Sequence, residues 1–349
     1  MASAVTPFRT PGTTPWPSRR HMPYTKTPTS RRLTCKTHRR FPRLRNERLQ
    51  VSRIKELVDK TWKVYKATPF FNFSYKSEGL KRYSRHLSAH LEAESSKNIV
   101  DVEGELGEHG TFEIMNGVAL SESDVEAVEI TVKTKKQNGN EDGKVVLIGV
   151  LCSVEIAEEC VIKNKQFTNL PVFLVKGNVA VTRHVINFLQ AQFDSNIIAM
   201  HFPPMELAWM IAMWTGFIPD AEESNVATSR NIPLELVYRV PEEIEGLRTI
   251  TMTIRAQDAK KMWKCVHNAD SEEFTNEEMN SFIHGIEQHF YYHFKIKLAA
   301  MSLHTIRCSI ASVDTDGRLK ILSNTSVHEV LRHVTQLIVD SMPPSICVS

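Results

Sequence analysis

Residues 304–323 read HTIRCSIASVDTDGRLKILS, and they carry the clearest strand pattern in the chain. Apolar and polar side chains alternate along 304–313 and again along 318–323, which is typical of strands with one buried face. Asp and Gly dominate residues 314–317 between them, and these residues accept the backbone angles of a tight turn. We therefore predict an antiparallel hairpin, which a further strand over 295–301 would extend into a meander.

Strand parity places basic side chains on one face of this meander. Successive side chains in a strand point to opposite faces. The polar face would therefore gather five cations and no acid: Lys295, Lys297, Arg307, Arg318 and Lys320. An ordinary solvated sheet face also carries such residues, and that interpretation stands level with contact to nucleic-acid phosphates. Lys144, at the start of another predicted hairpin, would lie at the rim.

Helices are predicted on both sides of this stretch in the sequence. Two of them begin with a capping box, a Ser or Thr followed three residues later by Glu: Thr275 with Glu278, and Ser326 with Glu329. A third, from Met205 to Trp214, is apolar almost all round, so protein must cover it on most sides. Strands and helices that mix in this way indicate an α+β fold.

The first half of the body contains the same two kinds of element. Apolar residues at helical spacing predict a helix from about Ser52 to Tyr65, and a second helix carries Leu80, Tyr83, Leu87 and Leu91. Strands are expected near 98–104, 110–115, 126–135 and 144–155, the last two joined as a hairpin through the turn-forming residues 138–143. The aromatic residues of 68–75 are interpreted as core, the alternative being a platform on which bases stack.

Composition divides the chain into an arm and two domains. Residues 1–50 contain twelve basic residues and one acid, a net charge of +11, whereas the remainder carries −8. The arm is rich in Pro, Thr, Ser and Arg and poor in aliphatic residues, so we expect it to be disordered. Residues 219–230 resemble an exposed linker, which gives an N-terminal α+β domain at 51–220 and a C-terminal one at 228–349.

The arm also offers candidate signals. Four Thr-Pro pairs could be phosphorylated by a proline-directed kinase, at Thr6, Thr10, Thr14 and Thr27. An Arg-rich, acid-poor start fits a mitochondrial transit peptide in composition, but seven prolines oppose the helix that such a peptide forms. Nuclear import through the Arg clusters is the favoured interpretation.

Motifs for catalysis are missing from the sequence. Asp314 to Gly317 resembles the opening of a calcium loop, but Thr325 stands where the bidentate acid belongs. No nucleophile elbow, Walker motif or paired-cysteine site occurs, so we expect no metal, no cofactor and no enzyme. The longest apolar run, Leu207 to Trp214, is far shorter than the ~20 residues of a membrane span. The alternative left open is a mitochondrial-matrix enzyme that uses Cys152 or Cys265 with a His partner.

Several blocks of the sequence together resemble the centromere protein L family. The resemblance covers about residues 55–335 and excludes the arm, the acidic 101–130 stretch and the tail after Ser341. The blocks that carry it are Trp62 to Pro69 with Phe73-Ser74-Tyr75, Trp209 to Thr215 (WMIAMWT), His293 to Ile296 with Leu298, Ser309 to Ser312, and Thr315 to Leu322 (TDGRLKIL).

This resemblance implies a non-enzymatic subunit of the inner kinetochore with curved antiparallel sheets flanked by helices. Such a subunit forms a heterodimer with a centromere protein N-like chain, contacts centromere protein C and the H-I-K-M subcomplex, and lines a basic channel for centromeric DNA beside the nucleosome. The location implied is the nucleus, at the centromere and kinetochore of the chromosome. Lys144, Arg307 and Arg318 match basic positions of the family, and these become the favoured DNA contacts. Partner pairing is expected in the C-terminal half, where an open sheet edge can accept a partner strand.

Overall fold

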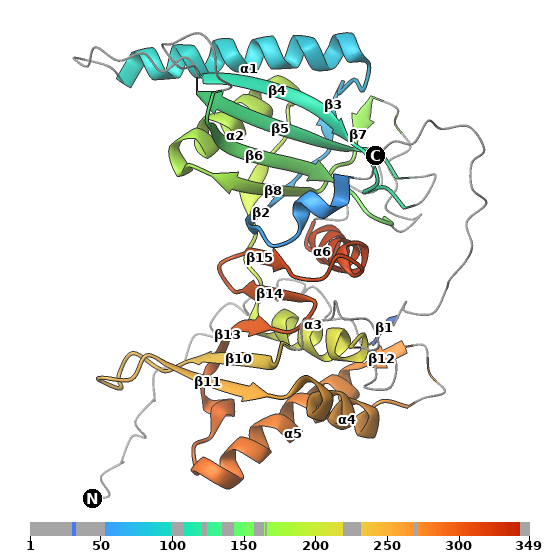
Figure 1. The fold of residues 1–349 in the computed structure, drawn as a ribbon, viewed down its shortest axis with the longest axis vertical. Helices are drawn as coiled ribbons and strands as arrows, with labels where there is room; N and C mark the ends of the chain where they lie inside the picture. Colours follow the sequence, from blue (N-terminus) through green and yellow to red (C-terminus); the bar gives the residue numbers. More distant parts are fainter. Residues whose placement is uncertain are drawn as a thin grey trace, which may run out of the picture.

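One large sheet runs the length of the molecule in the computed structural model (Figure 1). The structure describes residues 30–32, 53–98, 108–120, 124–134, 143–156, 164, 166–218, 232–268, 271 and 273–342. In spatial order the strands of the sheet are β11 (Thr249–Ile254), β10 (Leu234–Arg239), β13 (Ser302–Arg307), β14 (Ala311–Asp314), β15 (Arg318–Ile321), β2 (Thr61–Ala67), β8 (Val172–Gly177), β6 (Val145–Cys152), β5 (Ala127–Thr134) and β4 (Glu108–Met115), and β9 (Ile197–Ala199) also pairs with β2. Two strand pairs stand apart from it, β1 (Ser30–Arg32) with β12 (Glu273–Thr275) and β3 (Phe70–Phe71) with β7 (Phe167–Thr168).

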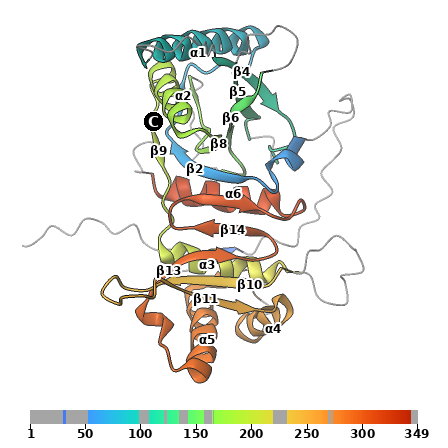
Figure 2. The same ribbon diagram turned by 60° about the vertical axis from the view of Figure 1, so that its left-hand side comes forward.

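Every pairing between these named strands is antiparallel, so the predicted α+β class is confirmed. The helices are α1 (Ser77–Asn98), α2 (Val179–Phe193), α3 (Pro204–Gly216), α4 (Ala256–Val266), α5 (Asn276–Phe294) and α6 (Val327–Asp340), with short 3-10 turns η1 (Arg53–Leu57) and η3 (Leu298–Ala300). In both views α1 and α2 lie at the end of the molecule that carries β4 to β6, and α4 and α5 lie at the other end (Figure 1, Figure 2). No described helix is long and apolar enough to span a membrane.

Two hydrophobic cores lie on opposite faces of the sheet. Val150 and Leu174 belong to the core that α3, α4, α5 and α6 cover, whereas their strand neighbours Leu151 and Phe173 belong to the core under α1 and α2. Adjacent side chains of a strand point to opposite faces, so this half of the sheet is covered on both sides. In β13 to β15 the apolar side chains join only the first core. The opposite face of these strands therefore carries polar residues.

Most of the local predictions are confirmed. The Thr275 hydroxyl accepts a hydrogen bond from the Glu278 amide, and the Glu278 carboxylate accepts one from the Thr275 amide, which completes the capping box of α5. Helix α3 is buried almost all round, as its composition predicts. The aromatic residues Phe70 and Phe73 pack with Phe193 in the core, which confirms the core interpretation over a base-stacking platform.

Four local predictions are wrong. The strand expected over 304–313 is two strands, β13 and β14, which pair with each other because the chain reverses at 308–310. The helix expected from Ser52 is a 3-10 turn, η1, followed by strand β2, because Trp62 and Tyr65 pack into different cores on opposite faces of the sheet. The second capping box does not form, since Ser326 makes no capping hydrogen bond. Residues 295–301 are no strand: Lys295 ends α5 with a φ of 57°, and η3 follows. In a strand, Ile296 and Leu298 would lie on the same face. Ile296 is exposed and Leu298 is buried, so these residues do not form a common buried face.

The two predicted domains share the large sheet. Strand β15 pairs with β2, with Arg318 opposite Lys63 and Lys320 opposite Thr61. Helix α3, from the first predicted domain, packs on β13, α4 and α5 of the second. The predicted linker at 219–230, the hairpin turn at 138–142 and most of the strand expected near 98–104 lie outside the described residues, and the domain boundaries stay a prediction. Asn98, the first residue of that expected strand, ends α1 instead.

Part of the predicted arm is ordered. Ser30 to Arg32 form β1, which pairs with β12 in a register that places Arg31 opposite Phe274. The expectation of disorder is wrong for these three residues, because Arg31 makes specific side-chain contacts that are described below. The four predicted phosphorylation sites lie outside the described residues.

Candidate nucleic-acid interface

Three polar residues form a row across the meander. Arg307 of β13 pairs with Ser312 of β14, which pairs with Lys320 of β15. Neighbouring strands lie about 5 Å apart, so the Cα atoms of Arg307 and Lys320 are separated by about 10 Å. Their sequence neighbours Ile306 and Leu319 are fully buried in the core. The structure thus brings Arg307 and Lys320 to one face, as strand parity predicted.

Three more cations border this row. Arg318, at the start of β15, is opposite Lys63 of β2, whose ammonium donates a hydrogen bond to the carbonyl of Asp316. Arg239, at the end of β10, is exposed, and its guanidinium donates to Nε2 of His304 at 3.0 Å. We call the surface formed by Arg307, Ser312, Lys320, Arg318, Lys63, Arg239, Glu235 and Asp314 the open face.

Lys63 and Arg239 were missed by sequence reasoning. Lys63 was placed in a helix that is in fact β2, and its neighbour in space, Arg318, is more than 250 residues away in the sequence. Arg239 ends β10, in which Leu234, Leu236 and Tyr238 are buried, so strand parity alone could have assigned it to a polar face. The pairing of β10 with β13, which brings it to this face, is not readable from local pattern.

Acids also stand on the open face, so the expectation of cations without an acid is wrong. The Glu235 carboxylate lies 3.5 Å from the Arg307 guanidinium, and the Asp314 carboxylate lies 3.9 Å from that of Arg318. Both arginine side chains remain substantially exposed, at 44% and 65%. Ion pairs in such exposed positions contribute only about 0–1 kcal/mol, so an anionic ligand can replace them.

The remaining predicted contacts lie elsewhere. Lys295 and Lys297 are exposed at the end of α5 and are not part of the meander; the ammonium of Lys295 lies 5.2 Å from the ring centre of Tyr292. Lys144 is exposed just before β6. Strands β2 and β8 separate β6 from β15. The structure therefore brings together three of the six predicted contacts.

A tight turn fixes the position of Arg318. The Gly317 amide donates to the Asp314 carbonyl at 3.1 Å, which confirms the predicted hairpin turn. Gly317 has a φ of 80°, and a Cβ built there would overlap the carbonyl oxygen of Met200. Its own carbonyl accepts a hydrogen bond from the Val64 amide at 2.8 Å. Only glycine satisfies both the backbone angle and the close approach.

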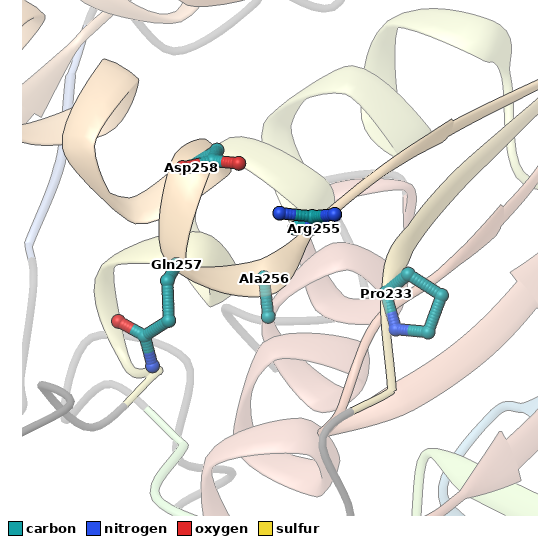
Figure 3. Close-up of a pocket in the computed structure, with 5 residues that line it drawn as sticks. All are labelled: Pro233, Arg255, Ala256, Gln257 and Asp258. Atoms are coloured by element: carbon teal, nitrogen blue, oxygen red, sulfur yellow. The ribbon is translucent and has the colours of Figure 1, made fainter.

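One pocket of about 310 Å³ opens at the start of α4 (Figure 3). Its lining residues are Pro233, Arg255, Ala256, Gln257 and Asp258. Its ionisable side chains are those of Arg255 and Asp258, and the Asp258 carboxylate lies 3.5 Å from the ammonium of Lys261. The lining contains neither Cys152 nor Cys265, the two cysteines on which the enzyme alternative depends.

The two cysteines named for that alternative differ in environment. Cys152 is fully buried, and burial raises the pKa of its thiol to about 12. Because the thiolate is the nucleophile, this residue is protonated and inert near neutral pH. Cys265 is exposed on α4.

Comparison with known proteins gives a consistent result. The sequence model of a family described as Centromere protein L matches residues 56–342. Centromere protein L of Xenopus tropicalis is 33% identical over 331 residues, which cover 93% of this chain and 89% of that protein. The human and mouse proteins of the same name are each 34% identical, over 80% of this chain and 79% and 82% of their own lengths. The resemblance noted from sequence blocks is confirmed, and the chain belongs to the centromere protein L family.

Proposed function

We propose that this chain is a non-enzymatic subunit of the inner kinetochore, located at the centromere in the nucleus, that holds centromeric DNA by its phosphates on the open face. In this proposal it pairs with a centromere protein N-like subunit, meets centromere protein C and the H-I-K-M subcomplex, and supports kinetochore assembly and chromosome segregation. The observation that carries the DNA assignment is the row from Arg307 to Lys320, bordered by Arg318 and Lys63.

The chemistry of the open face suits phosphate rather than base recognition. Arginine and lysine side chains neutralise phosphates and release counterions, and such contacts carry no sequence information. The face is a sheet surface, and the residues between the cations are small and polar, such as Ser312 and Thr61. We therefore assign to this face binding that is independent of sequence and dependent on salt.

Charge reversal tests this assignment. A variant with Arg307→Glu and Arg318→Glu, purified with its partner subunit, is expected to bind double-stranded DNA at least about tenfold more weakly at low salt. The matched control reverses Lys81 and Arg85, two exposed cations of α1 at the far end of the sheet. Equal binding by wild type and the Arg307/Arg318 variant would remove the DNA assignment.

Strand β11 is the proposed site of partner pairing. It is one edge of the large sheet, and among the described residues it pairs only with β10. At the other edge, β4, helix α1 already binds two amides, since those of Gly110 and Phe112 donate to the hydroxyls of Ser88 and Ser84. An edge strand with unpaired amides is a template for strand addition.

Hydrogen exchange on the chain alone and with its partner tests this site. Amides of Thr249–Ile254 should gain protection when a centromere protein N-like chain is added, while those of Glu108–Met115 in β4 should not change. Protection gained by β4 and not by β11 would place the partner elsewhere.

A further inference from the structure

We propose that α3, α6 and β12 form a binding groove for an arginine-bearing extended peptide, and that the chain's own residues Ser30–Arg32 occupy it as an intramolecular latch. The groove is separate from the open face and does not depend on the function proposed above. Its ligand is visible in the structure as strand β1, although the arm was expected to be disordered.

Three side chains of the proposed groove contact the guanidinium of Arg31. The guanidinium Nη2 donates to the Glu206 carboxylate at 2.7 Å, and Nη1 donates to Nε2 of His333 at 2.8 Å. The guanidinium carbon lies 4.9 Å from the ring centre of Trp209, within range for a cation–π contact. Only 10% of the Arg31 side chain is exposed. These residues come from α3 and α6, whose positions in the sequence are more than 170 and 300 residues from Arg31.

The side chains that line the groove favour arginine over lysine. Nε2 of His333 must be unprotonated to accept a hydrogen bond from a guanidinium, because arginine only donates. Burial, with the charges of Arg31 and Arg332, lowers the pKa of His333 to about 3, so the imidazole is a neutral acceptor at physiological pH. A planar guanidinium can donate to Glu206 and His333 at the same time while it stacks on Trp209, which the point charge of a lysine cannot reproduce.

Backbone pairing holds the peptide in register. Ser30 pairs with Thr275, Arg31 with Phe274 and Arg32 with Glu273. Phe274 is fully buried, with its ring edge-on to Trp209 at 6.2 Å between centres, so the wall of the groove is part of the main core. Strand addition to a short edge, with a side-chain pocket at one position, is a recurring mode of peptide recognition.

The latch has a consequence for the charge of the arm. Residues 33–52 contain six of the arm's twelve basic residues. Arg32 is held by β12, and Arg53 is held by its ion pair with Glu129 at 2.6 Å. The described residues on either side of this basic segment, Arg32 and Arg53, are therefore both fixed to the body.

Full-length protein variants test the latch. In Arg31→Ala protein, exchange of the Phe274 amide, opposite Arg31 in the β1–β12 register, should accelerate at least about tenfold, because one partner of a mostly buried ion pair is removed from the strand that pairs with it. The Glu273 and Thr275 amides donate to the side chains of Ser271 and Glu278, so their exchange should change little. Arg31→Lys should give an intermediate acceleration, since the positive charge remains but the planar guanidinium, which donates to two acceptors at once, is lost. Arg45→Ala, which removes an arm cation outside β1, is the matched control and should leave exchange unchanged. Equal exchange in wild type and Arg31→Ala protein would overturn the proposal.

A second measurement does not depend on how well the Arg31 variant folds. A protease site placed after Arg43 allows the arm to be cut from folded protein, and the released fragment is followed by gel filtration and titration. The wild-type fragment should stay bound and be displaced by a synthetic peptide of residues 24–38, but not by the same peptide with Arg31→Ala. A fragment that dissociates at once, or displacement by both peptides alike, would show that the groove does not recognise this arginine.

Discussion

Arg307 and Glu235 are opposite each other on β13 and β10, with the guanidinium Nη1 3.5 Å from the carboxylate Oε2. The acid therefore stands at the end of the row of cations that is proposed to hold phosphate. It competes with any anion that approaches Arg307, and it repels that anion at the same time.

Removing this acid should strengthen DNA binding. Glu235→Gln keeps the size of the side chain and deletes its charge, so the affinity of the partnered protein for DNA should rise about two- to fivefold at low salt. Glu78→Gln, at an exposed acid on α1, is the control and should have no effect. Weaker binding by the Glu235 variant would mean that the ion pair orients Arg307 rather than competes for it. Fluorescence anisotropy with a short duplex measures the difference.

The turn at Gly317 should be intolerant of any side chain. Gly317→Ala combines a positive φ with a Cβ that overlaps the Met200 carbonyl oxygen, and we expect the unfolding free energy to fall by about 3 kcal/mol. Gly246 has a similar φ of 85° but no atom within 4 Å of its virtual Cβ. Gly246→Ala should therefore cost only about 1 kcal/mol. Equal effects in urea denaturation would show that the backbone angle, and not the close approach, governs the turn.

His333 should make stability depend on pH. Its pKa is lowered to about 3 in the folded protein from an ordinary value of about 6.5. The unfolded chain therefore binds an extra proton between these values, and stability is lost as the pH falls below about 6.5, by up to about 1.4 kcal/mol per pH unit. The groups that face the ring are Arg31, Arg332 and Trp214.

The contribution of His333 is isolated by comparison with a substituted protein. His333→Gln keeps an acceptor for Arg31 and does not titrate, so its unfolding free energy should fall less steeply than that of wild type between pH 6.5 and 4. Parallel curves for the two proteins would contradict a buried neutral imidazole at this position.

Two capping boxes that look alike in sequence should behave differently. Thr275→Ala removes a formed cap and should cost about 1 kcal/mol. Ser326→Ala removes a hydroxyl that donates only to Ser323, at 3.3 Å, and should change stability by less than about 0.5 kcal/mol. Thermal denaturation of the two variants provides the comparison, and equal effects would contradict the difference in cap geometry.

Local sequence pattern predicted the elements that are determined by residues close together in the sequence. The alternation in 318–323 and the turn at Gly317 define β15 and its hairpin, and Thr275 with Glu278 defines the start of α5. The sequence pattern predicts a helix in place of β2 because β2 is an inner strand that packs on both faces. Its apolar residues Trp62 and Tyr65 serve different cores and so fall at a spacing of three.

The candidate site was predictable only in part for the same reason. Parity within β13 and within β15 identified the polar face of each strand. The reversal at 308–310, which makes β14 a separate strand and puts Ser312 between Arg307 and Lys320, was not predicted. The neighbours Lys63 and Glu235 come from distant strands, and no short-range pattern specifies which strands pair. The pairing of β1 with β12 was not predicted because amino-acid composition describes the average character of the fifty-residue arm. Only three of its residues, Ser30–Arg32, pair with β12.

The salt dependence of DNA binding tests the central claim most directly. The dissociation constant of the partnered protein is measured from low to moderate salt for wild type and for a variant with Arg307→Ala, Arg318→Ala and Lys320→Ala. If these three side chains neutralise phosphates, the slope of log K against log salt should become shallower by about 0.9 for each phosphate that is no longer neutralised, and by about 2–3 in all. An unchanged slope would show that the open face does not hold DNA.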